Sequence, residues 1–142
     1  MLRINYLLAL KGKNVWSIDP DAAVLDAIRL MAERGVGALP VMRSGELLGI
    51  VSERDYARKV ILKGRSSADT PVRDIMTTPV VTVATHEAVH DCMEIMTQKR
   101  IRHLPVVDKG QVVGIISIGD LVKAVIEEQQ QTIDQLERYI AS

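Results

Sequence analysis

Two short stretches of the sequence combine a hydroxyl and a carboxylate at a fixed spacing. Gly-Ile-Val-Ser-Glu-Arg-Asp at residues 49–55 recurs as Gly-Ile-Ile-Ser-Ile-Gly-Asp at residues 114–120. Ser-x-x-Asp after an apolar run is a variant of the capping box, so each copy predicts a strand, a tight turn and a helix start. Free N–H groups at a helix N-terminus suit phosphate, and the carboxylate can accept hydrogen bonds from sugar hydroxyls. The pattern indicates nucleotide binding, and a capping box without a ligand is the alternative.

A second stretch carries the residues of a zinc hydrolase. Residues 86–90 read His-Glu-Ala-Val-His, which matches His-Glu-x-x-His, where a helix sets two imidazoles one turn apart beside a carboxylate. Met93 and Met96 stand where the longer signature has Gly and a third His, and His103 is the only other histidine. We therefore expect no metal and no enzymatic activity, and keep the zinc hydrolase as a minor alternative.

Composition narrows the class of protein. Of 142 residues, 47% are hydrophobic and 3% aromatic, with no Phe, so the core must be aliphatic with Met as filler. Lys+Arg and Asp+Glu are both 18, and this zero formal charge argues against a nucleic-acid binder. Cys92 is the only cysteine, which indicates a reducing compartment. With no apolar run long enough for a membrane span or a signal peptide, we expect a cytoplasmic protein with no membrane partner.

The elements that position the two Ser-x-x-Asp stretches form a tandem repeat. Pro40 and Pro105, like Asp55 and Asp120, coincide at an ungapped offset of 65 (105 − 40). Such self-similarity predicts a duplicated fold. We expect an α/β (α+β) protein of two β-α-β-β-α units about a pseudo-twofold axis. Residues 1–70 would hold the first unit with an N-terminal helix and the linker, and residues 71–142 the second unit with a C-terminal helix.

Local patterns predict the elements of each unit. In the first, we expect a helix at 5–10 that packs on this unit, a strand at 15–18 and a helix opened by Asp19-Pro20-Asp21. A hairpin of 38–42 and 46–51 and a helix over 52–63 follow, before a polar linker at 64–71. In the second, we expect a helical approach at 72–76, a strand at 80–83, a helix with buried Cys92, a hairpin of 102–107 and 111–116, and a helix from Ser117.

The last helix has an apolar stripe of its own. The members of this stripe are Val122, Ile126, Ile133, Leu136 and Ile140. If polar Gln129 is counted with them, the spacing alternates between three and four residues, as along the seam of a coiled coil. Such an amphipathic tail packs on its own body or on a partner subunit. A surface helix of a monomer is the alternative.

The paired motifs resemble those of a tandem pair of CBS domains, named after cystathionine β-synthase and often called a Bateman module. Leu-Pro-Val occurs in each hairpin and Gly-Ile-x-Ser-x-x-Asp before each last helix, and the resemblance runs from about residue 15 to 126. It implies a stand-alone bacterial regulatory sensor that binds adenosine-containing ligands (AMP, ADP, ATP, S-adenosylmethionine or NAD) in clefts between the units, and a homodimer. The ligand, the occupancy of each cleft and the downstream protein stay open, as does an interaction module without ligand.

The resemblance also assigns roles to individual residues. In the first half it implies Asp55 for ribose, Ser52 for phosphate and Ser17, Ile18, Gly37 and Ala38 for adenine. In the second half it implies Asp120, Ser117, and Thr82, Val83, Ile101 and His103 in the same roles. Arg102 and His103 offer phosphate contacts where the first half has Gly37 and Ala38, so we favour the Asp120 site for AMP-like ligands. Arg54, Arg58 and Lys59 would neutralise a longer phosphate chain at the first site, unless they form only a solvated helix face.

Overall fold

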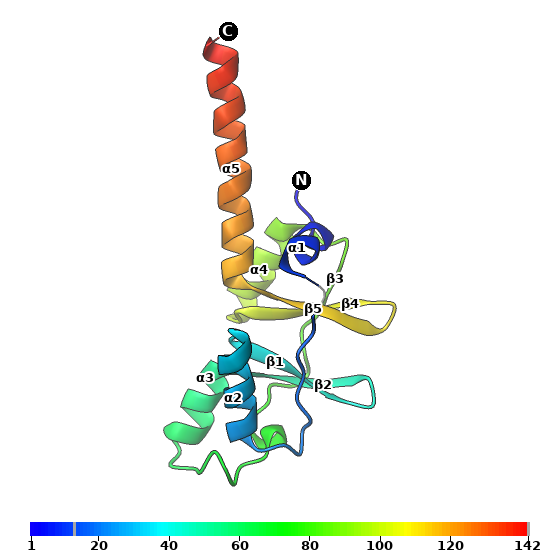
Figure 1. Cartoon of the computed structure of the whole chain (residues 1–142), viewed down its shortest axis with the longest axis vertical. Helices are drawn as coiled ribbons and strands as arrows, with labels where there is room; N and C mark the ends of the chain where they lie inside the picture. Colours follow the sequence, from blue (N-terminus) through cyan, green and yellow to red (C-terminus); the bar gives the residue numbers. More distant parts are fainter. Residues whose placement is uncertain (13, 142) are drawn as a thin grey trace. The chain divides into compact units, whose positions relative to one another are not determined.

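The computed structural model describes residues 1–12 and 14–141. It divides into two compact units, one made of Met1–Asn14 with Thr82–Ser142 and the other of Val15–Val81. Each is a small sheet covered by helices, so the mixed α/β class predicted from the sequence is confirmed (Figure 1).

The unit of the first repeat is built around one hairpin. Its strands β1 (Ala38–Arg43) and β2 (Glu46–Ser52) are antiparallel, with Ala38 opposite Ser52. Ser44 and Gly45 form the two-residue turn at φ values of 52° and 79°, which is the backbone of a type I′ hairpin. The helical segments of this unit are, in chain order, α2 (Val24–Arg34), the four-residue α3 (Glu53–Tyr56), a π-helical stretch (Ala57–Ile61) and a 3₁₀ turn (Val72–Asp74).

The unit of the second repeat has the same plan at the predicted offset. Its sheet runs β3 (Val83–Ala84), β4 (His103–Asp108), β5 (Gln111–Ser117), with β3 parallel to β4 and β4 antiparallel to β5. His103 lies opposite Ser117, as Ala38 lies opposite Ser52. The helices are α1 (Ile4–Lys11), α4 (Val89–Lys99) and α5 (Ile118–Ala141). The duplication is therefore visible in the strand register itself.

The helix predicted to open at Asp19-Pro20-Asp21 begins later, at Val24. Asp19 instead accepts a hydrogen bond from the Asp21 backbone N–H in a local turn. No side chain caps α2, whose N-cap is Ala23; the Val24 N–H donates instead to the Thr70 carbonyl and the Leu25 N–H to the Ser67 carbonyl. In the second repeat the Val89 N–H donates in the same way to the Leu2 carbonyl. A backbone segment from elsewhere thus satisfies an N–H group at each helix start that has no acceptor within the helix.

The N-terminal helix packs on the second repeat, so the prediction that it packs on the first is wrong (Figure 1). The Ile4 N–H donates to the Glu87 carbonyl and the Asn5 N–H to the Thr85 carbonyl. The equivalent place on the first repeat is already filled, because the Val72 N–H donates to the Ala22 carbonyl. The segment over 72–76, predicted as an approach to the second unit, therefore closes the first.

Each repeat is thus completed by the segment that precedes the other repeat in the chain, and this exchange of leading segments gives each unit an aliphatic core. In the first repeat Val72 and Ile75 are completely buried beside Leu39 and Val41, and in the second Ile4 is buried in the same way. The predicted helix stripes also point inward, since Met31 and Cys92 are buried. Among the described residues, no helix is both long enough and apolar enough to cross a membrane.

Candidate ligand-binding half-sites

Both Ser-x-x-Asp stretches form the predicted helix starts. In the first repeat the Asp55 backbone N–H donates to Ser52 Oγ (3.2 Å), and the Ser52 N–H donates to Asp55 Oδ2 (2.9 Å). In the second, the Asp120 N–H donates to Ser117 Oγ (3.1 Å) and the Ser117 N–H to Asp120 Oδ2 (2.9 Å). Each hydroxyl and carboxylate is therefore held in place at the first turn of a helix.

Backbone hydrogen bonds bring the hairpin entry to each helix start. The Glu53 N–H donates to the Gly37 carbonyl (3.1 Å), and the Ile118 N–H donates to the Arg102 carbonyl (2.9 Å). Gly37 and Ala38 thus adjoin Ser52, and Arg102 and His103 adjoin Ser117.

The predicted strand at 15–18 is not formed, because only Ile18 makes an isolated bridge there, and the strand predicted at 80–83 is the two-residue β3 at Val83–Ala84. Ile18 bridges Val41 in parallel, and Val83 pairs with Val106 in parallel. Ser17 and Thr82 precede these positions and are exposed, and Ile101 is half-buried at the end of α4. The predicted residues of each half therefore gather on three adjoining segments of one unit.

The carboxylate of the first half-site has protein partners on both oxygens. Ser52 Oγ donates to Asp55 Oδ2 (3.0 Å), in addition to the Ser52 N–H, while Lys59 Nζ lies 3.0 Å from Oδ1 and Thr77 Oγ1 donates to it (3.3 Å). The Asp55 side chain is only 12% exposed. Lys59 also donates to the Ile75 carbonyl (2.9 Å), so this lysine is committed to the protein, whereas Arg54 and Arg58 are exposed.

The carboxylate of the second half-site is more open. Asp120 Oδ2 accepts hydrogen bonds from the Ser117 N–H and from Lys11 Nζ (2.7 Å), and no described residue donates to Oδ1. The side chain is 31% exposed. Lys11, at the end of α1, donates as well to the Ile115 carbonyl (2.8 Å). Oδ1 of Asp120 therefore has no hydrogen-bond donor among the described residues, while Oδ2 is held by the ammonium of Lys11.

Charges around this second carboxylate shift two pKa values. Burial works to raise the pKa of Asp120, but the hydrogen bond and charge of Lys11 and the hydrogen bonds from Ser117 outweigh it, and the pKa is lowered. The pKa of His103 is also lowered, chiefly by burial and then by the charge of Lys11, against the opposing effect of Asp120. Asp120 therefore stays ionised and His103 favours its neutral form, in which one ring nitrogen accepts hydrogen bonds.

Two residues at these half-sites were missed by the sequence analysis, Lys11 and Thr77. Both lie at or just after a leading segment that packs on the other repeat. These segments match each other at an offset of 68 (72 − 4), which pairs Ile4 with Val72 and Leu8 with Met76. Leu8 and Met76 accordingly occupy equivalent places, each against the strand glycine of its unit. A search for repeats that allowed a gap of three residues would have found this signal.

The His-Glu-x-x-His stretch does not have the geometry of a zinc peptidase. His86 lies in a turn, and α4 begins only at Val89, so His86 and His90 are not one helical turn apart on one face. The His86 carbonyl accepts a hydrogen bond from Arg3 (2.6 Å). Within residues 1–12 and 14–141, no cluster of three or more His, Cys, Asp or Glu side chains is arranged to hold a metal.

One open cavity of about 310 Å³ lies in the unit of the first repeat, and it is not the predicted nucleotide site. It shares only Gly37 with the predicted residues. Glu53 is the single charged residue of its lining, and the other members are Ile28, Met31, Ala32, Gly35 and Val36. A cavity whose only charge is negative does not suit a phosphate.

Comparison with known families explains the shared plan of the two repeats. The family model for the CBS domain matches residues 10–62 and 72–127, which is most of the chain. The chain belongs to the CBS-domain family. The resemblance noted in the motifs is therefore confirmed. Pairs of CBS domains are regulatory modules.

Similar proteins share both sequence and fold with this CBS pair. The CBS domain-containing protein CBSX3, mitochondrial, of Arabidopsis thaliana is 42% identical over 96% of this chain and 71% of its own length. A protein with CBS domains from Burkholderia ambifaria MC40-6 superposes with a TM-score of 0.86 at 46% identity, covering 90% of this chain and 96% of that one. The CBS pair of protein MJ0100, solved with 5′-methylthioadenosine and S-adenosyl-L-methionine, shares the fold at 23% identity (TM-score 0.80; 90% and 98% covered).

Proposed function

We propose that this CBS pair is a non-catalytic sensor that binds an adenine nucleotide (AMP, ADP, ATP or a dinucleotide such as NAD) at the half-site of the second repeat. The observation that carries this proposal is that no described residue donates to Oδ1 of Asp120, while Ser117 holds this carboxylate at a helix N-terminus. A ribose diol would donate to this oxygen. In the first half-site both oxygens of Asp55 are already engaged by Ser52, Lys59 and Thr77.

Positive groups beside the second carboxylate suit the phosphate of the same ligand. Lys11 lies against Asp120, and exposed Arg102 accepts the first hydrogen bond of α5 through its carbonyl. The N-terminus of this helix adds partial positive charge and the Ser117 hydroxyl. Thr82, Val83, Ile101 and His103 would then hold the adenine.

The first half-site is proposed as the weaker one. A ribose there would have to displace Lys59 or Thr77 from Asp55 Oδ1, at a cost in protein hydrogen bonds. Exposed Arg54 and Arg58 would favour a ligand with a longer phosphate chain. The remaining proposed contacts of this half-site are Ser17, Ile18, Gly37, Ala38 and Ser52.

Adenosine-containing ligands in the MJ0100 pair support the ligand class, although that protein shares only the fold. Binding would act as a signal through different affinity for different arrangements of the protein, because a ligand shifts an equilibrium only by that difference. We propose a second copy of the chain as one partner, a further protein as the receiver of the signal, and a reducing compartment such as the cytoplasm, given the single buried Cys92.

Mass spectrometry of small molecules released from the denatured purified protein, with metals counted in the same sample, tests the proposal first. Titration calorimetry with AMP, ADP, ATP and NAD then compares the wild type with Asp120→Ala and with the matched Asp55→Ala. We expect one dominant site that Asp120→Ala removes and Asp55→Ala retains. Normal binding by Asp120→Ala would leave the carboxylate with a capping role only, and stoichiometric zinc would revive the hydrolase.

A second candidate function is an interaction module without ligand. The exposed apolar face of α5 favours it, since Ile126 is 60% and Leu136 57% exposed. A melting temperature that does not change with any nucleotide of the panel would support this candidate over the sensor.

A further inference from the structure

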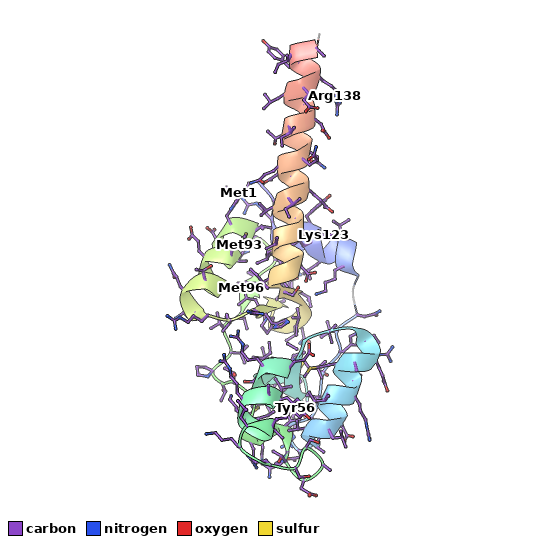
Figure 2. The ribbon with its side chains drawn as sticks, turned by 90° about the vertical axis from the view of Figure 1, so that its left-hand side faces the viewer. Met1, Tyr56, Met93, Met96, Lys123 and Arg138 are labelled. Atoms are coloured by element: carbon purple, nitrogen blue, oxygen red, sulfur yellow. The ribbon has the colours of Figure 1, made fainter. Side chains whose placement is uncertain are left out.

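The C-terminal helix extends well past the rest of its unit. It has 24 residues, a length of about 36 Å at 1.5 Å per residue. Leu121 and Ala124 are buried in its first turns, and α5 contacts α4, the helix on which Figure 2 labels Met93 and Met96. The later turns, where Figure 2 labels Arg138, have no other element of the unit beside them (Figures 1 and 2).

An apolar stripe runs along this free part on its own side of the helix. The exposed members are Val122 (39%), Ile126 (60%), Ile133 (47%), Leu136 (57%) and Ile140 (81%). With Gln129 they fall within an arc of roughly 80° at 100° per residue, and the arc centres about 130° from the Leu121 and Ala124 side that faces the body. The stripe is therefore separate from the packing of α5 on its own unit.

The residues of the stripe follow a heptad repeat with a specific composition. Ile126, Ile133 and Ile140 occupy the a positions, and Val122, Gln129 and Leu136 the d positions. Isoleucine at every a position favours two parallel strands, because a β-branched side chain packs well at a in that geometry, and Leu136 supplies the leucine that this combination prefers at d, whereas Val122 and Gln129 depart from it.

We propose that this stripe is the docking surface for the same stripe of a second copy of the chain, in a parallel two-stranded coiled coil. In a parallel, in-register pair each seam residue faces the same residue of the other copy. Gln129 therefore opposes Gln129, and the two side-chain amides can hydrogen-bond to each other. An antiparallel pair would oppose Gln129 with Ile133 and leave a polar group without a partner in an apolar layer.

Charges next to the seam permit this pairing. The flanking g-to-e pairs of a parallel coil would be Val125 with Gln130 and Thr132 with Glu137, so no like charges face each other. Apart from Glu137, the charged residues from Glu127 to Arg138 lie at outer positions of the heptad. The surface is thus self-complementary, which is what a second copy requires.

This inference rests on the homodimer in the proposed function and adds the surface through which the copies meet; it does not depend on the ligand. A seam of about two and a half heptads holds two copies weakly by itself, since short helices gain little from pairing alone. The experiment therefore traps the pair covalently in the full chain. Cys92 is fully buried and does not compete in the reaction.

The test compares Gln129→Cys with Gln131→Cys, two substitutions of the same kind on the seam and on the outer face. Under mild oxidation we expect a disulfide-linked dimer for Gln129→Cys, because a d layer brings equivalent β-carbons face to face. Adding Ile133→Glu to Gln129→Cys should lower the yield roughly tenfold or more, because it places two carboxylates in an apolar layer. The matched Gln131→Glu should leave the yield unchanged.

Equal trapping of the two cysteine variants, or trapping of Gln129→Cys that Ile133→Glu does not reduce, would overturn the inference. Light scattering on the wild type separates this failure from that of the homodimer. A dimeric mass without trapping at residue 129 would mean that the copies meet through another surface or antiparallel. A monomeric mass at every concentration would reject the inference and the homodimer together.

Discussion

Replacing Asp55 and Asp120 by alanine, one at a time, separates the structural role of the two carboxylates from a role in binding. The residues are equivalent in the repeat and both cap a helix, so each variant loses a cap contact worth about 1 kcal/mol. The remaining cost depends on what else each carboxylate touches and on how deeply it is buried.

Asp55 has the larger additional cost. Its side chain is 12% exposed and holds Lys59 at 3.0 Å and the Thr77 hydroxyl at 3.3 Å. Lys59 is 43% exposed and partly recovers hydration, so we expect Asp55→Ala to lose about 3 kcal/mol in total, given ~1.5–3 kcal/mol for a hydrogen bond to a charged group. The Asp120 ion pair with Lys11 is exposed by about a third on both sides and adds at most about 1 kcal/mol, so Asp120→Ala should lose only ~1–2 kcal/mol.

The two variants should therefore rank in opposite orders in two assays. At about 3 °C per kcal/mol for a chain of this size, Asp55→Ala should lower the melting temperature by about 9 °C and Asp120→Ala by about 4 °C. Nucleotide affinity at the second half-site should fall roughly 10- to 150-fold in Asp120→Ala, for the loss of ~1.5–3 kcal/mol of charged hydrogen bonding.

Circular dichroism melts and calorimetry on the same preparations measure both quantities. Equal destabilisation by the two substitutions would refute the reasoning from burial. Equal loss of nucleotide affinity would refute the assignment of the ligand to the second half-site.

Three further changes test the surroundings of this half-site. The pKa of His103 is lowered in the folded protein, so the unfolded chain binds this proton more readily, and wild-type stability is full above pH 6.5 and falls below it. His103→Gln should therefore flatten the dependence of the urea midpoint on pH between about 7 and 5. Lys11→Met should raise the pKa of Asp120, measured by carboxyl NMR titration, since Lys11 lowers it by a hydrogen bond and by charge. Gly114→Ala would place the new β-carbon 2.5 Å from Leu8 Cδ2, the end of a side chain that can shift, so it should cost about 1 kcal/mol of stability. In a double-mutant cycle followed by thermal melts, this cost should be smaller when Leu8 is already replaced by alanine.

Local chemistry made much of the fold predictable. The ungapped repeat predicted both hairpins. Ser52 and Asp55 predicted the helix start between them, because a capping box depends only on residues that are close in the chain. The start of α2 was placed too early at Asp19, since the donor there is satisfied by the Thr70 carbonyl, a partner far along the chain. Patterns within one segment carry no information about such a partner.

The exchange of leading segments was hidden for the same reason. By composition, the apolar segment from Ile4 to Leu8 could pack on either repeat. It packs on the second repeat because residues 72–76 already fill the equivalent position on the first. The approach of Lys11 to Asp120 follows from that exchange and was therefore not predictable from a single repeat. The assignment of nucleotide-binding residues stays a prediction, although the structure brings those of each half together.

The two half-sites differ in where their lysine comes from, and this difference has a consequence for dynamics. Lys59 sits one helical turn after Asp55, but the equivalent residue after Asp120 is Ala124, which is buried. A lysine would not fit there, so the ammonium comes from α1 instead. Because Lys11 binds Oδ2 of Asp120 and no described residue donates to Oδ1, a ribose at the proposed site would not have to displace Lys11, and a phosphate would then hold Lys11 from the other side.

Ligand binding at the second half-site should consequently tighten α1. We expect slower hydrogen exchange at the last amides of this helix and at Gly12, whose N–H donates to the Leu8 carbonyl, when a nucleotide is added. In Lys11→Met the nucleotide should no longer slow this exchange, whereas Lys59→Met, which alters the other half-site, should leave the effect intact. Faster exchange in the bound wild type would mean that the ligand expels Lys11, and the open oxygen of Asp120 would then not be what admits the ribose.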